Sequence, residues 1–342
     1  MVIVSTPGVV VLPVYESFQD RVFYDKSFKS PDPAEMTAQS EATSDQPLVD
    51  APEAPAMELD AVIRSKDNLE FCKRIDRKLA SVTLRGCLQM AMHKSEYRSV
   101  KGEPIYYVNF EATAAQKPLG KVLVLGGVHG DELTSISTVY LWISTLKEFH
   151  SGLFDWRVVP LVNPDGFFSN KAKRTNANGV DLNRNLPTYQ WNQLANRYWQ
   201  RYAGGTERKF PGYNPASEPE TEWLINEINT YKPDVIVTVH APYNLVDFDA
   251  ADRSSAPRRL GVLPGKSLGT FPGSLGRYAG EERNIPVITL ELPHSWRMPP
   301  KRDVNAIWDD LVVWLRQNIN THNIAGRSFN QCAASPLAVG CI

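Results

Sequence analysis

Apolar positions along residues 59–320 follow two alternating periods. Short runs rich in β-branched residues, such as residues 121–125 and 235–239, are typical of strands buried on both faces. Between such runs, apolar residues recur at the spacing of helices that bury one side. The pattern predicts strands over residues 81–93, 105–110, 121–125, 156–162, 235–239 and 287–290, and helices over residues 69–79, 132–148, 218–231, 274–283 and 304–318.

Strands that alternate with helices indicate an α/β domain with a mixed, mostly parallel sheet flanked by helices. In such folds ligands bind beyond the carboxyl ends of the strands. Residues 27–57 are rich in proline, serine, alanine and acidic residues without apolar periodicity, and we expect residues 1–58 to form a flexible N-terminal extension. We expect one catalytic domain over residues 59–320 and a C-terminal tail over residues 321–342.

The charge balance and hydropathy of the chain limit the kinds of binding partner that we expect. The 37 lysines and arginines nearly balance the 38 acidic residues, so no global charge attracts nucleic acid or an anionic membrane. No apolar run reaches the length of a membrane span, and the first residues lack the basic region of a secretory signal. We expect a cytoplasmic protein, with the periplasm and the oligomeric state left open.

Four cysteines occur, at positions 72, 87, 332 and 341. None has the spacing of a zinc finger or a redox motif, so the sequence favours ordinary thiols. A disulfide between Cys332 and Cys341 is the alternative, and it would suit an oxidising compartment.

Three predicted strands run directly into residues that suit a hydrolytic metal site. Residues 121–125 lead to His129 and Glu132, residues 235–239 lead to His240, and residues 287–290 lead to Glu291. Catalytic zinc takes three protein ligands from histidines and carboxylates and leaves one position open. We therefore predict one zinc ion per chain on His129, Glu132 and His240, with Glu291 as the base that takes a proton from the attacking water.

Each of these residues also has a structural interpretation. Glu132 could be an acid favoured at a helix start, and either histidine an ordinary residue at a strand end. Glu291 could form a salt bridge with Arg283 or Arg297. The metal site is favoured because all of them fall at strand ends together.

A second polar cluster lies between the first and third predicted ligands. Asn183 and Arg184 suit a substrate carboxylate, because the guanidinium binds it through two prongs and the amide adds a directional donor. Arg174 could stabilise the oxyanion formed when water attacks an amide, or be a solvated charge. Asp181 could orient one zinc histidine. The turn Asn163-Pro-Asp-Gly166 is equally suited to a plain structural role.

These residues together resemble the zinc carboxypeptidase (funnelin) family, in that family's chain order, over residues 80–320. The motifs are His129-Gly-Asp-Glu132, Asn163-Pro-Asp-Gly166, Gly179 to Asn185, His240 and Glu291. The resemblance implies a mixed eight-stranded sheet between helices. It also implies the same roles for the zinc ligands, the catalytic Glu291 and Arg174, and the carboxylate-binding Asn183 and Arg184.

Two segments differ from the digestive carboxypeptidases. The third ligand stands in His240-Ala-Pro-Tyr243, and a Phe271-Pro-Gly-Ser-Leu-Gly276 segment precedes the catalytic glutamate. Both look more like the bacterial murein peptide amidase branch, which cleaves the γ-D-glutamyl to meso-diaminopimelate bond during cell-wall recycling. Ser274 or Arg277 could then contact the diaminopimelate, although a solvated turn explains both.

The predicted function is thus zinc-dependent cleavage of a small murein peptide. The alternatives are a carboxypeptidase of ordinary peptides, an acyl-amino-acid deacylase, and a non-catalytic zinc-containing module that binds muropeptides. The motif from Asp181 to Asn185 favours a peptidase over the deacylase, and the presence of Glu291 favours catalysis over binding alone.

Overall fold

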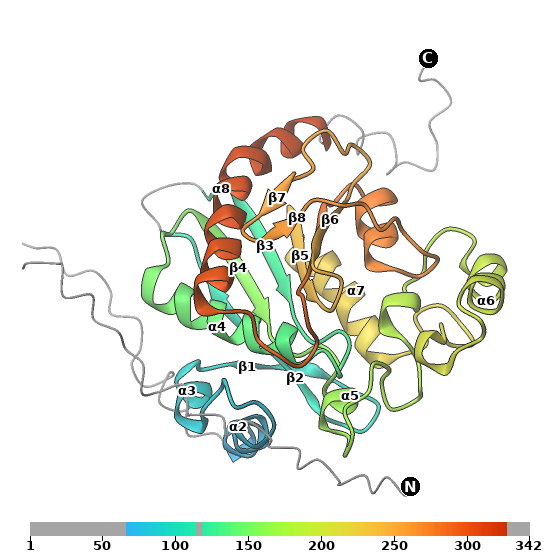
Figure 1. The fold of residues 1–342 in the computed structure, drawn as a ribbon, viewed down its shortest axis with the longest axis horizontal. Coiled ribbons are helices and arrows are strands. Elements are labelled where there is room, and N and C mark those ends of the chain that lie inside the picture. Colours follow the sequence, from blue (N-terminus) through green and yellow to red (C-terminus); the bar gives the residue numbers. More distant parts are fainter. Residues whose placement is uncertain (1–65, 114–117, 327–342) are drawn as a thin grey trace, which may run out of the picture. The chain divides into compact units, whose positions relative to one another are not determined.

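The computed structural model describes residues 66–113 and 118–326, with side chains up to Ile319. Its centre is a sheet of seven strands in the order β1-β2-β4-β3-β5-β9-β6 (Figure 1). The strands are β1 (His93–Arg98), β2 (Pro104–Phe110), β3 (Gly120–Leu125), β4 (Phe154–Val159), β5 (Val235–His240), β6 (Leu245–Asp249) and β9 (Val287–Glu291). A separate two-stranded ribbon pairs β7 (Arg259–Leu260) with β8 (Leu263–Pro264).

The four central strands, β4, β3, β5 and β9, are parallel, while β1, β2 and β6 join by antiparallel pairing. The expected mixed α/β sheet is therefore confirmed, but it contains seven strands in the described residues and not eight. His240 and Glu291 are the last residues of β5 and β9 and are register partners. The parallel core thus brings these two side chains to the same sheet edge.

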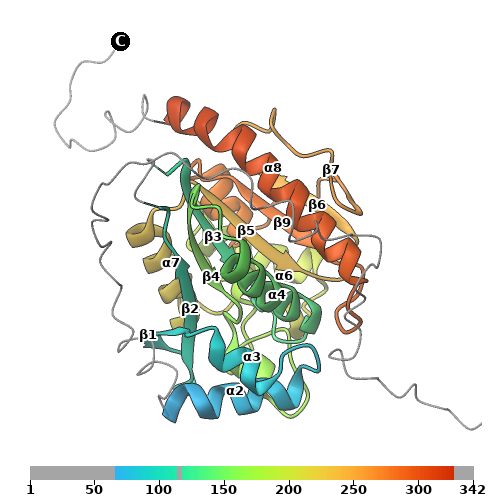
Figure 2. The same ribbon diagram turned by 90° about the vertical axis from the view of Figure 1, so that its left-hand side faces the viewer.

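Helices cover both faces of the sheet. On one face, α2 (Lys66–Lys78), α4 (Leu133–Phe149) and α8 (Lys301–Gly326) pack with the strand residues Val122 and Val124. On the other face, Trp223 of α7 (Pro219–Tyr231) packs with Leu123 and Leu125. Figure 2 shows α4 and α8 on one side of the sheet and α7 on the opposite side. Successive residues of β3 point to opposite cores, which explains its uninterrupted apolar run.

The strand predicted over residues 81–93 is wrong. Residues Leu84–Gln89 form the helix α3, whose start is capped by the Thr83 hydroxyl accepting from the Gly86 N–H. Cys87 of α3 forms a disulfide with Cys72 of α2 across a Cα–Cα distance of 5.6 Å, so these two cysteines are not the free thiols expected. The leucines and methionine of this segment favour a helix over a strand once a cap is available.

The helix predicted over residues 274–283 is a π-helix, η4 (Gly276–Glu281), that lies against β6. A Cβ on Gly276 would collide with the Asp249 carboxylate, so glycine is needed for this close approach.

The closing helix α8 continues to Gly326, into the segment expected to be a tail. The proposed boundary at residue 58 and the pair Cys332 and Cys341 lie outside the described residues. Within residues 66–113 and 118–326, no helix is long and apolar enough to cross a membrane.

Candidate metal and catalytic site

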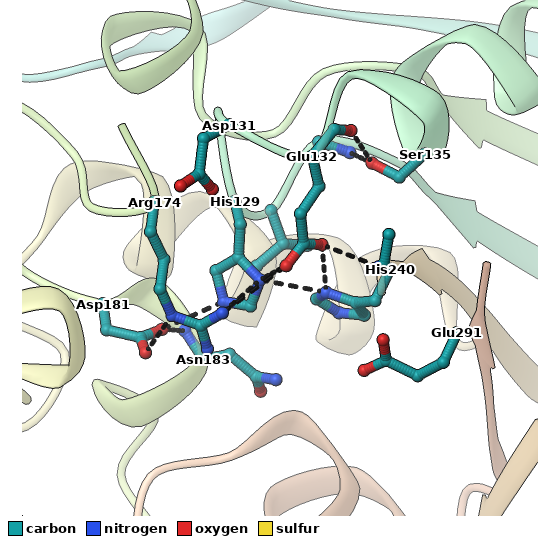
Figure 3. A network of polar contacts seen from close by, with 12 residues as sticks. His129, Asp131, Glu132, Ser135, Arg174, Asp181, Asn183, His240 and Glu291 are labelled. Atoms are coloured by element: carbon teal, nitrogen blue, oxygen red, sulfur yellow. Dashed lines mark hydrogen bonds and ion pairs between the residues drawn. The ribbon is translucent and has the colours of Figure 1, made fainter. Parts of the chain in front are cut away.

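His129, Glu132 and His240 converge at the carboxyl ends of β3 and β5 (Figure 3). Glu132 stands immediately before α4, one residue earlier than the first helical turn in which it was expected. Its Oε1 lies 2.8 Å from His129 Nδ1, and its Oε2 lies 2.9 Å from His240 Nδ1. The three side chains are almost completely buried.

The donor set fits a zinc ion. The two Nδ1 atoms of His129 and His240 are 3.0 Å apart, so two ring nitrogens converge on one point beside a carboxylate. Burial lowers the pKa of His240, whereas the carboxylates of Glu132 and Asp181 raise the pKa of His129 against its burial, so a bound cation would displace a proton from that ring. Burial alone would raise the pKa of Glu132, but the two adjacent rings hold it well below its ordinary value. Neutral nitrogens and an ionised carboxylate at one point are what a shared divalent cation requires.

Asp181 fixes which nitrogen of His129 points at the metal position. The His129 Nε2 lies 3.1 Å from Asp181 Oδ1, so the Nε2–H donates to the carboxylate and Nδ1 keeps its lone pair. Asp181 also accepts from Arg174 Nε at 2.9 Å, which places Arg174 Nη1 3.1 Å from His129 Nδ1 and 3.5 Å from Glu132 Oε1. A nearly buried guanidinium is thereby held beside the metal position.

Glu291 faces the same cavity without touching the three predicted ligands. Its Oε2 accepts only a long contact, 3.4 Å, from the Tyr243 N–H, and the side chain is 7% exposed. Burial, helped by the negative charge of Glu132, raises the pKa of Glu291 to about 7. In the described part of the chain, Arg283 donates to Asn229 and Arg297 to His294, so neither forms the alternative salt bridge. A carboxyl with a pKa near neutrality can both take and return a proton.

Asn183 and Arg184 line the same cavity of about 370 Å³. Asn183 Oδ1 accepts from Leu275 N at 2.8 Å, which leaves the amide N–H groups as the donors it can offer. Arg184 is 8% exposed, stacks on the Phe271 ring at 4.4 Å, and donates to the Asn183 carbonyl at 2.6 Å. Its buried Nε has no partner among the described residues, and burial lowers the pKa of this guanidinium. A buried cation without a paired carboxylate calls for an anionic ligand.

Ser274 and Arg277 are occupied by local contacts. The Ser274 hydroxyl accepts from the N–H groups of Phe271 and Arg277 at 3.1 and 3.3 Å, although Ser274 lines the cavity. Arg277 pairs with Glu282 at 3.1 Å. These contacts favour the turn-forming interpretation of both residues over direct contact with a substrate.

The cavity also contains two acidic residues that the sequence analysis did not select. Asp247 and Asp249 of β6 are 3% and 5% exposed, and both line the cavity. Arg253 contacts both carboxylates, at 3.3 and 3.5 Å, so one cation faces two acids. Burial, together with the charge of Asp247, raises the pKa of Asp249 to about 7. In the sequence, acids that alternate with apolar residues resemble a strand at the solvent-exposed edge of a sheet. The packing of η4 against β6 shows instead that these acids form the floor of the cavity.

Comparison with known proteins places the geometry in context. The profile of the zinc carboxypeptidase family, Peptidase_M14, matches residues 90–259. Murein peptide amidase A of Escherichia coli strain K12 is 33% identical over 204 residues, covering 57% of this chain and 79% of that protein. Murein peptide amidase A of Vibrio campbellii is 33% identical over 202 residues, covering 57% and 77%. The thrombin-activatable fibrinolysis inhibitor shares the fold, with a TM-score of 0.53, 16% identity, and coverage of 75% and 72%.

Proposed function

This chain belongs to the zinc carboxypeptidase family, and from that premise we propose a zinc-dependent amidase that cleaves murein peptides at the γ-D-glutamyl to meso-diaminopimelate bond. The reaction would release diaminopimelate for cell-wall peptide recycling. The family membership makes the chain a metallopeptidase, while the bond and the residue roles are the proposal.

The roles follow from where each side chain lies. His129, Glu132 and His240 would hold the zinc ion, which supplies Lewis-acid polarisation of the scissile carbonyl when bound. Glu291 would take a proton from the attacking water and return it to the leaving amine. Arg174, held by Asp181, would donate to the oxyanion that develops on the carbonyl oxygen.

The observation that carries the substrate proposal is the pair of opposite, unbalanced charges in one cavity. Arg184 is a buried guanidinium whose Nε has no partner in the part of the chain that the structure describes, and Asp247 and Asp249 are buried carboxylates that share Arg253. Diaminopimelate as the leaving residue carries a free α-carboxylate for Arg184 and a side-chain ammonium for the acids. The buried guanidinium and the buried carboxylates would then each find an oppositely charged group on the same substrate residue.

A second candidate is a carboxypeptidase that removes lysine from ordinary peptides. The same acidic floor favours it, because a C-terminal lysine also presents a carboxylate and an ammonium. This candidate differs in the acyl side of the bond, where an ordinary peptide is α-linked.

The Cys72–Cys87 disulfide bears on the compartment. Disulfides persist in oxidising surroundings and are rare in the cytoplasm of mesophiles. It favours the periplasm, which the sequence left open, over the cytoplasm expected first.

The test compares L-Ala-γ-D-Glu-meso-diaminopimelate with hippuryl-lysine and hippuryl-phenylalanine, using the zinc-loaded full chain and mass spectrometry. We expect release of diaminopimelate from the tripeptide with a kcat/KM far above that for either hippuryl substrate. Preferential cleavage of hippuryl-lysine would support the carboxypeptidase instead. No cleavage of any of the three would refute the proposed activity.

A further inference from the structure

A second hollow of about 300 Å³ opens beside the catalytic cavity. Arg174 and Arg208 line both spaces, so the hollow adjoins the cavity that contains the predicted metal ligands. None of His240, Glu291 or Arg184 lines it. Figure 3 shows Arg174 and Asp131 on the side of His129 that faces away from Glu291. The hollow therefore lies across the metal position from the proposed leaving-residue pocket.

The lining of this hollow is basic. Lys171, Lys173, Arg174 and Arg208 contribute four cationic side chains, and Glu207 contributes the one acid among the described lining residues. Lys171 and Lys173 are exposed, and neither forms an ion pair with any residue in the described ranges. An excess of positive charge beside a partly enclosed space attracts an anion.

The backbone that carries these cations is held in place. The Lys173 N–H donates to the Gly166 carbonyl at 2.9 Å, and the next carbonyl, that of Arg174, accepts from Asn163 Nδ2 at 3.1 Å. Arg208, which also lines the hollow, forms an ion pair with Asp131, which stands between two predicted metal ligands in the chain. The turn at residues 163–166 thus has a structural role, because it anchors one wall of the hollow.

We infer that this basic hollow binds a free carboxylate on the acyl side of the substrate, the side that contributes the scissile carbonyl. The inference rests on the proposed function, because Arg184 and the acidic floor then hold the leaving residue on the other side. A γ-linked glutamyl group keeps its α-carboxylate free, three carbons from the scissile carbonyl. An α-linked residue without an acidic side chain has no carboxylate there, so the hollow selects a γ-linked glutamyl group over such residues.

The experiment changes one functional group of the substrate. The full chain is assayed with L-Ala-γ-D-Glu-meso-diaminopimelate and with the same peptide in which the glutamyl α-carboxylate is an α-amide. We expect kcat/KM to be about two- to fivefold higher for the carboxylate, the range for exposed charge pairs, and the ratio to fall as salt is raised.

The double variant Lys171→Gln/Lys173→Gln should reduce that ratio towards one while leaving cleavage of the amide peptide nearly unchanged. The control is Lys301→Gln, which removes a charge from an exposed position at the start of α8 and should preserve the ratio. Equal rates for both peptides in the unmodified chain would overturn the carboxylate site and leave the amidase activity standing. Failure to cleave either peptide would overturn the proposed function and this site with it.

Discussion

Replacing Glu291 by glutamine tests the proposed proton transfer most directly. The substitution preserves the shape of a side chain that is 7% exposed, and its amide oxygen can still accept from the Tyr243 N–H. It removes the ability to take a proton from water. Because Glu291 forms no hydrogen bond or ion pair with His129, Glu132 or His240, the metal position should be retained.

The expected loss can be bounded. A positioned general base contributes roughly 10²- to 10⁴-fold, which corresponds to about 3–5 kcal/mol of activation free energy. The raised pKa of about 7 makes Glu291 a stronger base than an ordinary carboxylate, which favours the upper part of this range. Activity requires the ionised form, so kcat/KM should fall as the pH drops below the Glu291 pKa. A bound dication would shift that limb to lower pH, because it favours the carboxylate.

The assay measures kcat/KM for the murein tripeptide from pH 5 to 9, with zinc content determined on the same samples. Glu291→Gln should bind zinc as the unmodified chain does, lose activity, and lose the acidic limb of the pH profile. Glu96→Gln, an exposed acid on β1, is the matched control and should change neither. Activity within tenfold of the unmodified chain, with zinc bound, would remove Glu291 from the mechanism.

Three further predictions concern the residues around the site. Asp181→Asn should weaken zinc binding about 10- to 100-fold in a competition titration, because a neutral amide with one oxygen replaces the carboxylate that contacts both His129 and Arg174; unchanged affinity would contradict this. Burial raises the pKa of Glu220 from 4.5 to about 7, so its protonated form stabilises the fold below pH 4.5 and that contribution is lost as the pH rises through 7. Glu220→Gln should therefore raise the melting temperature at pH 8, by a stabilisation of about 1–3 kcal/mol, and leave it unchanged at pH 4.5. The double variant Cys72→Ser/Cys87→Ser should lower the unfolding free energy by about 3 kcal/mol, the chain-entropy value for a separation of 15 residues, and equal denaturation midpoints would contradict the disulfide.

The parallel core could be predicted from the sequence because its strands are short and buried on both faces. Runs such as residues 121–125 have no competing helical period, so their short length and β-branched residues identify them as strands. Each of these strands leads to a polar residue at its carboxyl end. The convergence of His129, Glu132 and His240 followed from that placement, since parallel strands end at one sheet edge.

The α3 segment and the edge strand β6 could not be predicted in the same way. The segment over residues 81–93 contains leucines and methionines that serve either element, and the choice of helix depends on Thr83 and on the distant Cys72. Strand β6 reads as Leu-Val-Asp-Phe-Asp, and its acids conceal that all five residues are buried. Asp247 and Asp249 were missed because their burial depends on η4, a contact between segments more than 25 residues apart.

The arrangement of buried charge suggests how the site rejects wrong substrates. Binding an apolar leaving residue would remove water from Asp247 and Asp249 without providing a cation, and would leave the Arg184 Nε unpaired unless a carboxylate reached it. Each such uncompensated group costs about 1–3 kcal/mol, more when it is charged. Selectivity would therefore come mainly from penalties against apolar residues, as in sites built to bind a polar group. The raised pKa of Asp249 limits this free-energy penalty, because its carboxylate can take up a proton when no cation is present. We therefore expect discrimination between diaminopimelate and phenylalanine as leaving residues to increase with pH across the range in which Asp249 ionises.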